Sequence, residues 1–126
     1  MARRVLSIGS PQHGTSLAEI GLAFAGQCPE ACRQMVPDST FLRRLNADGE
    51  TPEGPAFVSV WTTSDEVVVP PVSARLEGAL NFTVQSVCAA VETPHSDLPE
   101  DPVVLAALAT TLGAGPPRPP DDVTCA

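Results

Sequence analysis

FVSVWTTSDEVVVP, residues 57–70, is the stretch that decides the fold. Its first part, residues 57–61, is rich in β-branched and aromatic side chains, so we expect a buried strand there. Small hydroxyl residues, two acids and a pair of prolines follow. In open α/β sheets the functional side chains lie just beyond the carboxyl ends of the strands. Asp65 is therefore the first residue for which we predict a functional role.

A second strand-like run, residues 81–88 (NFTVQSVC), leads into a loop that contains His95. An acid after one strand and a histidine after the next correspond to the last two members of a Ser…Asp…His chain order. Asp65 and His95 are thus a candidate catalytic pair. Two alternatives stay open: Asp65 as a turn-forming residue and His95 as a solvated loop histidine. Glu66 is the rival acid, although its side chain should point to the opposite face.

Length and charge limit the classes of function. A chain of 126 residues forms at most one small domain. The net charge of −8 argues against a nucleic-acid partner, which requires a basic face, and against electrostatic docking on anionic lipid. No apolar run is long enough to span a membrane. The sequence as given also shows no signal peptide, because the apolar part of its basic N-terminus is too short.

The four cysteines are an even number, which suits disulfides in an oxidising compartment. Three pairings exist on paper, and the economical one joins Cys28 with Cys32 and Cys88 with Cys125. A zinc site is the alternative, but the spacing lacks a CxxC knuckle and there is no second close pair. We expect no cofactor and no metal. Three acids that resemble a calcium cluster are better explained as a solvated loop and a helix cap, namely Asp97, Glu100 and Asp101.

The order of elements predicts an α/β layered sheet. We expect strands near residues 4–10, 57–61 and 81–88, with helices at 17–25, 40–46 and 103–112. Residues 1–113 would form the folded part, and 114–126 a Pro-rich tail tethered by Cys125. Three strands of a parallel sheet leave an unprotected edge, through which the chain could self-associate.

Four segments together resemble a known family: IGSPQHGT (8–15), WTTSDEVV (61–68), ARLEGALN (74–81) and PH (94–95). They look like the second half of bacterial secreted lipases, most of all the small actinobacterial-type triacylglycerol lipases of the α/β-hydrolase fold. The resemblance runs in order along nearly the whole chain. It implies a partial α/β-hydrolase fold, built from the last three strands of the parallel sheet with flanking helices and without the N-terminal half that carries the nucleophile.

The resemblance also implies site roles, a substrate and a location. Asp65 would be the acid of a Ser–His–Asp triad and His95 its base. Residues 10–15 would line the mouth of the site, and the helix at 17–25 with the turn at 28–32 would lie near the entrance of the acyl chain. The substrate would be a lipid ester, and the protein would be extracellular.

The sequence departs from this family at the nucleophile. It contains no G-x-S-x-G elbow, and the oxyanion donors associated with that elbow are missing with it. We therefore expect a lipase fragment that carries the acid and the histidine without the nucleophilic serine, inactive and poorly soluble alone. The alternative is an inactive remnant that acts as a lipid- or protein-binding module.

Overall fold

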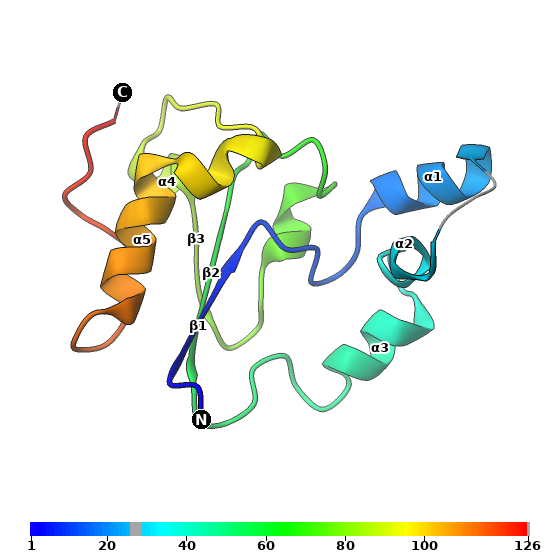
Figure 1. Cartoon of the computed structure of the whole chain (residues 1–126), viewed down its shortest axis with the longest axis horizontal. Helices are drawn as coiled ribbons and strands as arrows, with labels where there is room; N and C mark the ends of the chain where they lie inside the picture. The colour runs from blue at the N-terminus through cyan, green and yellow to red at the C-terminus, as the bar shows by residue number, and fades with distance from the viewer. Residues whose placement is uncertain (26–28, 126) are drawn as a thin grey trace.

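The computed structural model describes residues 1–25 and 29–125, and a three-stranded parallel sheet lies at its centre (Figure 1). The strands β1 (Arg4–Ile8), β2 (Ala56–Trp61) and β3 (Leu80–Thr83) are adjacent in that order. Ile8 lies beside Val60 and Trp61 beside Thr83. The carboxyl ends of all three strands therefore meet at one edge, where an α/β sheet places its site. The predicted α/β class, a partial α/β-hydrolase sheet with flanking helices, is confirmed.

Helices and short helical turns connect the strands. They are α1 (Ser16–Ala25), α2 (Glu30–Gln34), α3 (Thr40–Asn46), η1 (Pro71–Ala74), α4 (Val84–Val87), η2 (His95–Glu100) and α5 (Pro102–Leu112). In Figure 1, α5 and the C-terminal tail lie on one side of the sheet, and α1, α2 and α3 form a stack on the other side. None of the helices in the described part of the chain is long and apolar enough to cross a membrane.

Alternation along β2 explains how the two faces of the sheet are covered. Val58 and Val60 are buried in the main core, which also contains Val103, Val104 and Ala107 of α5. Ser59 is buried too, and its hydroxyl donates to the carbonyl of Ala74 in η1 at 2.6 Å. Successive side chains of a strand point to opposite faces, so β2 is apolar toward α5 and polar toward η1.

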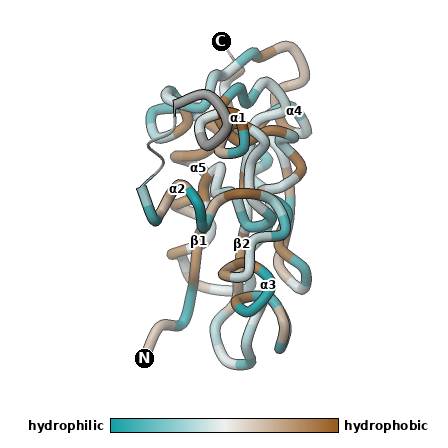
Figure 2. Tube along the Cα trace, turned by 90° about the vertical axis from the view of Figure 1, so that its right-hand side faces the viewer, coloured by the Kyte–Doolittle hydropathy of each residue, from teal (hydrophilic) through white to brown (hydrophobic). Residues whose placement is uncertain are grey.

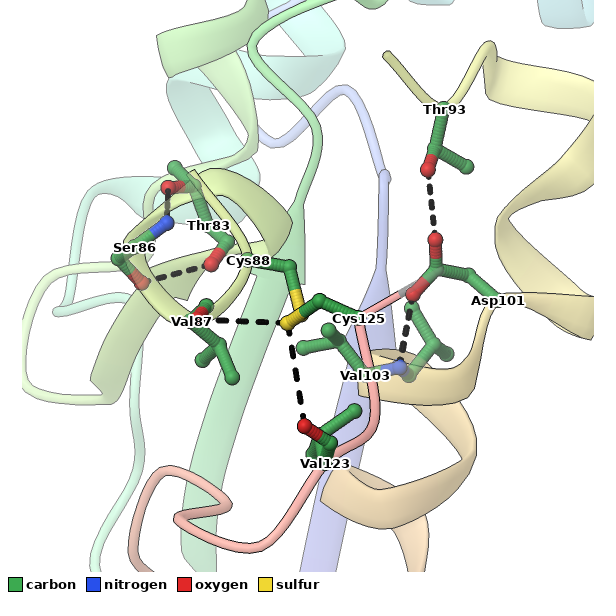
Figure 3. The surroundings of a disulfide bond; sticks show 10 residues. Thr83, Ser86, Val87, Cys88, Thr93, Asp101, Val103, Val123 and Cys125 are labelled. Carbon is green, nitrogen blue, oxygen red and sulfur yellow. Dashed lines mark hydrogen bonds between the residues drawn. A yellow bond between two sulfur atoms is a disulfide. The ribbon is translucent and has the colours of Figure 1, made fainter. Parts of the chain in front are cut away.

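The prediction of a strand over residues 81–88 is wrong beyond Thr83, where β3 ends and α4 begins. The Thr83 hydroxyl accepts a hydrogen bond from the backbone N–H of Ser86 at 3.0 Å. The Ser86 hydroxyl donates to the Thr83 carbonyl at 2.6 Å, as Figure 3 shows. Such local bonds from Ser and Thr compete with a sheet ladder and favour a helix start. The apolar Val84 is buried from the helix instead of from a strand.

A disulfide between Cys88 and Cys125 holds the C-terminal tail against α4 (Figure 3). A second contact fixes the start of the tail, because the Arg4 guanidinium donates to the Gly115 carbonyl at 2.5 Å. The tail is thus tethered through Cys125, as the sequence predicts. The other expected pairing involves Cys28, which lies outside the described residues, so its pairing with Cys32 stays a prediction.

Candidate active site

Asp65 and His95 meet at the carboxyl edge of the sheet. Asp65 follows β2, and His95 is the first residue of η2 in the loop after α4. The distance from His95 Nδ1 to Asp65 Oδ2 is 2.8 Å. The Asp65 side chain is 1% exposed and the His95 side chain 31% exposed. The structure therefore brings the two predicted residues together, with the acid covered and the imidazole accessible.

The environment of Asp65 decides which imidazole nitrogen carries the hydrogen. Its Oδ1 atom accepts hydrogen bonds from the backbone N–H groups of Val67, at 2.9 Å, and Val68, at 2.7 Å. Both carboxylate oxygens are thus engaged, which holds the buried group in one orientation. A carboxylate only accepts, so Nδ1 of His95 is the donor of the 2.8 Å contact. Nε2 then keeps its lone pair and is the nitrogen able to accept a proton.

Glu66, the rival acid, lies on the same loop but does not bond the ring. Its Oε2 atom accepts a hydrogen bond from the backbone N–H of His95 at 3.2 Å. Two adjacent acids therefore hold His95: Asp65 bonds its imidazole ring, and Glu66 bonds its backbone N–H. The expectation that the Glu66 side chain points to the opposite face from Asp65 is wrong, because the loop after β2 brings both carboxylates to His95.

The loop that carries His95 is closed at its base by a buried carboxylate. The Thr93 hydroxyl donates to Asp101 Oδ2 at 2.6 Å, and Asp101 Oδ1 accepts from the backbone N–H of Val103 at 2.8 Å (Figure 3). Asp101 is thereby the N-cap of α5, as the sequence predicts. Leu98, between the two ends of the loop, is buried in the core. These contacts fix η2, and with it the backbone of His95, to the body of the sheet.

Gly9, directly after β1, is the other site residue that sequence reasoning missed. Its φ of +52° is in the left-handed region. A Cβ at this position would lie 2.7 Å from Leu98 Cδ1 and 3.4 Å from His95 Nδ1. Glycine therefore allows the end of β1 to approach the imidazole closely. A glycine immediately after a strand is the sequence signal that could have indicated this approach.

A cavity of about 430 Å³ opens beside His95. Most of the lining is apolar and comes from the loop after β1, from α1 and from the loop after Asp65. Its lining residues include Pro11, Thr15, Leu17, Ala18, Met35 and Val68. Of the loop at 10–15, which the resemblance placed at the mouth of the site, Ser10, Pro11 and Thr15 line this cavity. A mostly apolar concave surface with one accessible imidazole is suited to an apolar ligand.

His13, the second histidine, lies apart from this cavity. Its Nε2 is 2.5 Å from Glu50 Oε1, and its Nδ1 is 3.2 Å from the Ser73 carbonyl. Burial raises the pKa of Glu50, but the hydrogen bond from the Glu77 backbone and the contact with His13 outweigh it, so the net pKa lies below the ordinary value of 4.5. This pair joins the loop after β1 to the loop before β2 and so supports the wall of the site.

The described residues supply an acid and a base without a nucleophile bonded to them. Within residues 1–25 and 29–125, no serine hydroxyl makes a hydrogen bond to Nε2 of His95. In the same part of the chain, no group of three or more His, Cys, Asp and Glu side chains gathers as a metal ion would require.

A parallel sheet that presents a buried acid and an accessible imidazole at its carboxyl edge has the architecture of the α/β hydrolases. The profile of the family Lipase (class 2) matches residues 2–103, and the chain belongs to this family. The match covers all three strands, Asp65 and His95. A search of curated proteins finds no match for the chain.

Proposed function

We propose that this chain supplies the acid and the base of a Ser–His–Asp hydrolase that cleaves carboxylic esters of lipids. The single observation that carries the proposal is the 2.8 Å contact between Asp65 Oδ2 and His95 Nδ1, with Nε2 left to accept a proton beside an apolar cavity. Asp65 would hold the tautomer of His95 and stabilise its cation, and His95 would take the proton of a serine hydroxyl. Membership of the lipase family supports a lipid ester as the substrate.

In this proposal the nucleophilic serine lies on a segment outside the 126 residues. No G-x-S-x-G elbow occurs in the sequence, while β1 is an edge strand whose carboxyl end is followed by Gly9, beside the imidazole. A parallel strand paired with that edge would end next to His95, and an elbow following it would present a serine there. The chain would then be the C-terminal part of the catalytic domain, close to the actinobacterial-type lipases. The Cys88–Cys125 disulfide supports an extracellular location.

The test starts with the DNA upstream of the Met1 codon. We expect an open frame that encodes a strand, a G-x-S-x-G elbow and a helix within about 100 codons. The protein extended by this segment should hydrolyse p-nitrophenyl esters, and His95→Ala should lower kcat by at least about a thousandfold. Absence of an elbow in every frame would contradict the placement of the nucleophile.

A second candidate function is favoured by the missing elbow: a catalytically inactive chain that binds lipid through its apolar surface. It predicts no ester turnover by the 126-residue chain but measurable binding of a hydrophobic probe. Turnover by that chain, abolished by His95→Ala, would reject this candidate. If such turnover occurred, Ser10→Ala would identify its nucleophile, because Ser10 lines the same cavity as His95.

A further inference from the structure

Gln85, the second residue of α4, bonds through its side chain to two loops that follow different strands. In both views of the molecule, Figure 1 and Figure 2, α4 lies toward the carboxyl end of the sheet. The side-chain oxygen Oε1 of Gln85 accepts a hydrogen bond from the backbone N–H of Thr63 at 2.9 Å. The side-chain nitrogen Nε2 donates to the Val91 carbonyl at 3.0 Å and to the Thr62 hydroxyl at 3.0 Å. One half-buried amide therefore joins the loop after β2 to the loop after α4.

The bonding partners of Gln85 fix the orientation of its amide. A backbone N–H only donates and a backbone carbonyl only accepts, so the oxygen must face Thr63 and the NH2 group must face Val91. A glutamate at this position would place a second acceptor against the Val91 carbonyl, and a methionine would remove the donors altogether. The bridge between the loops therefore requires the chemistry of a glutamine side chain as well as its length.

On the acid side, the bridge holds the turn that leads into Asp65. Thr62 is fully buried, and its hydroxyl accepts a hydrogen bond from the backbone N–H of Ser64 at 3.2 Å as well as the bond from Gln85. Asp65 follows Ser64 directly, and its carboxylate bonds to groups that lie further along the chain. Gln85 therefore restrains the end of this turn that the carboxylate itself does not hold.

On the histidine side, the bridge holds the entry to the loop that carries His95. Val91 lies before His95, packs against the core, and accepts the bond from Gln85 through its carbonyl. Further along this loop, the bond from Thr93 to Asp101 closes the base against the start of α5. Gln85 therefore adds a restraint from the direction of the loop after β2.

We propose that Gln85 is a positioning residue for the Asp65–His95 pair. Its amide sets the separation of the two loops, and this separation keeps Asp65 Oδ2 and His95 Nδ1 at hydrogen-bonding distance. Among the described residues, the Gln85 side chain bonds to neither member of the pair, so it acts through the loops and takes no part in proton transfer. Its meaning for catalysis rests on the proposed function, whereas the restraint on the pair can be measured without ester hydrolysis.

The first experiment measures how fast the Nδ1–H hydrogen of His95 exchanges with solvent in the 126-residue chain, by ¹H–¹⁵N NMR of the imidazole. This hydrogen exchanges when the ring leaves Asp65, so a looser pair exchanges faster. We expect Gln85→Met and Gln85→Glu each to raise the exchange rate about tenfold, because both remove the bonds that Nε2 donates. Ser86→Ala is the matched control and should leave the rate unchanged, because it removes a 2.6 Å hydrogen bond from the same helix but none to either loop.

Variants of Thr62 test the same bridge without changing Gln85. Thr62→Val removes the acceptor hydroxyl at similar shape and should also raise the exchange rate, whereas Thr62→Ser keeps the hydroxyl and should match the parent chain. Parent-like exchange in both Gln85 variants, or an equal rise in Ser86→Ala, overturns the proposal. If the Gln85 variants do not fold, the Thr62 pair decides, and parent-like exchange in Thr62→Val overturns it.

Kinetics of the protein extended by its upstream segment separate this role from the proposed function. Gln85→Met should lower kcat for p-nitrophenyl esters about ten- to a hundredfold and leave KM unchanged, because a displaced base slows the chemical step and not substrate binding. Hydrolysis at the parent rate in this variant overturns the positioning role and leaves the proposed function intact. Absence of hydrolysis in the extended parent, together with the expected exchange rates, overturns the proposed function and leaves the restraint on the pair established.

Discussion

Replacing Asp65 by Asn should move the hydrogen of the His95 imidazole from Nδ1 to Nε2. The side-chain amide has one oxygen and one NH2 group, and three donors face it: two backbone N–H groups at Val67 and Val68, and the ring. Placing the oxygen toward the two backbone donors preserves two hydrogen bonds, whereas the flipped amide preserves one. The NH2 group then faces Nδ1, which must become an acceptor. The variant would therefore present the wrong tautomer for proton abstraction.

The cost in stability follows from the same contacts. Exchanging a carboxylate for a neutral amide converts charge-assisted hydrogen bonds into neutral ones, a loss of about 2 kcal/mol in the free energy of unfolding. Asp65→Ala should cost more, about 4 kcal/mol, because it leaves buried backbone donors unsatisfied. Urea unfolding followed by the fluorescence of Trp61, which is the single tryptophan and is buried, measures both values.

Long-range ¹H–¹⁵N NMR of the imidazole in alkaline buffer reads the tautomer directly and requires no enzymatic activity. We expect the Nδ1–H form in the parent chain and the Nε2–H form in Asp65→Asn. Asp97→Asn is the matched control, because Asp97 is an exposed acid on the same turn that bonds Ser96 and not the ring. An Nε2–H imidazole in the parent chain, or an unchanged tautomer in the variant, would refute this account of the pair.

Three further outcomes concern stability. Gly9→Ala should lower the free energy of unfolding by about 2–4 kcal/mol, because an alanine there has a left-handed backbone and a methyl group pressed against the buried Leu98. Gly49→Ala, whose new methyl group meets nothing within 4 Å, should cost less. An equal cost in the two variants would show that the contact with Leu98 contributes nothing. Replacing Cys88 and Cys125 by Ser should cost about 4 kcal/mol in chemical denaturation, since the disulfide spans 37 residues; a loss below about 1 kcal/mol would show that the tail is held without it. The pKa of Glu50 is lowered in the folded chain, so its stabilising contribution is present above pH 4.5 and is lost as the pH falls through the lowered pKa. The difference in the free energy of unfolding between the parent chain and Glu50→Gln should therefore shrink in acid. A difference that grows in acid would contradict the direction of the pKa shift.

The parts of the fold that the sequence predicts are those decided by short-range patterns. Residues 57–61 lie in β2 (Ala56–Trp61) because a run of β-branched and aromatic side chains fits a covered central strand. Asp101 caps α5 because an acid directly before Pro102 satisfies the first free N–H groups of a helix. The chain order predicted that Asp65 and His95 follow neighbouring strands and meet at one edge, since parallel strands have their carboxyl ends at the same edge.

The parts that the sequence does not predict depend on contacts between distant residues. Residues 84–87 have the composition of a strand, but the Thr83 cap and the burial of Val84 make them helical. The carboxylate of Glu66 reaches the backbone of His95 across 29 residues, a contact that no local pattern encodes.

Three sets of contacts within this chain hold His95 and its loop in place. Its side chain is fixed by Asp65, its backbone by Glu66, and the base of its loop by the bond from Thr93 to Asp101. In the proposed hydrolase, an imidazole held in this way would need little rearrangement when its reaction partner arrives, and such positioning lowers the barrier to proton transfer. It also restricts the partner, because a rigid imidazole accepts a proton only from a hydroxyl placed in line with Nε2. For the proposed hydrolase, the position of the nucleophilic serine is therefore determined by the half of the site described here, beyond Gly9 at the free edge of β1.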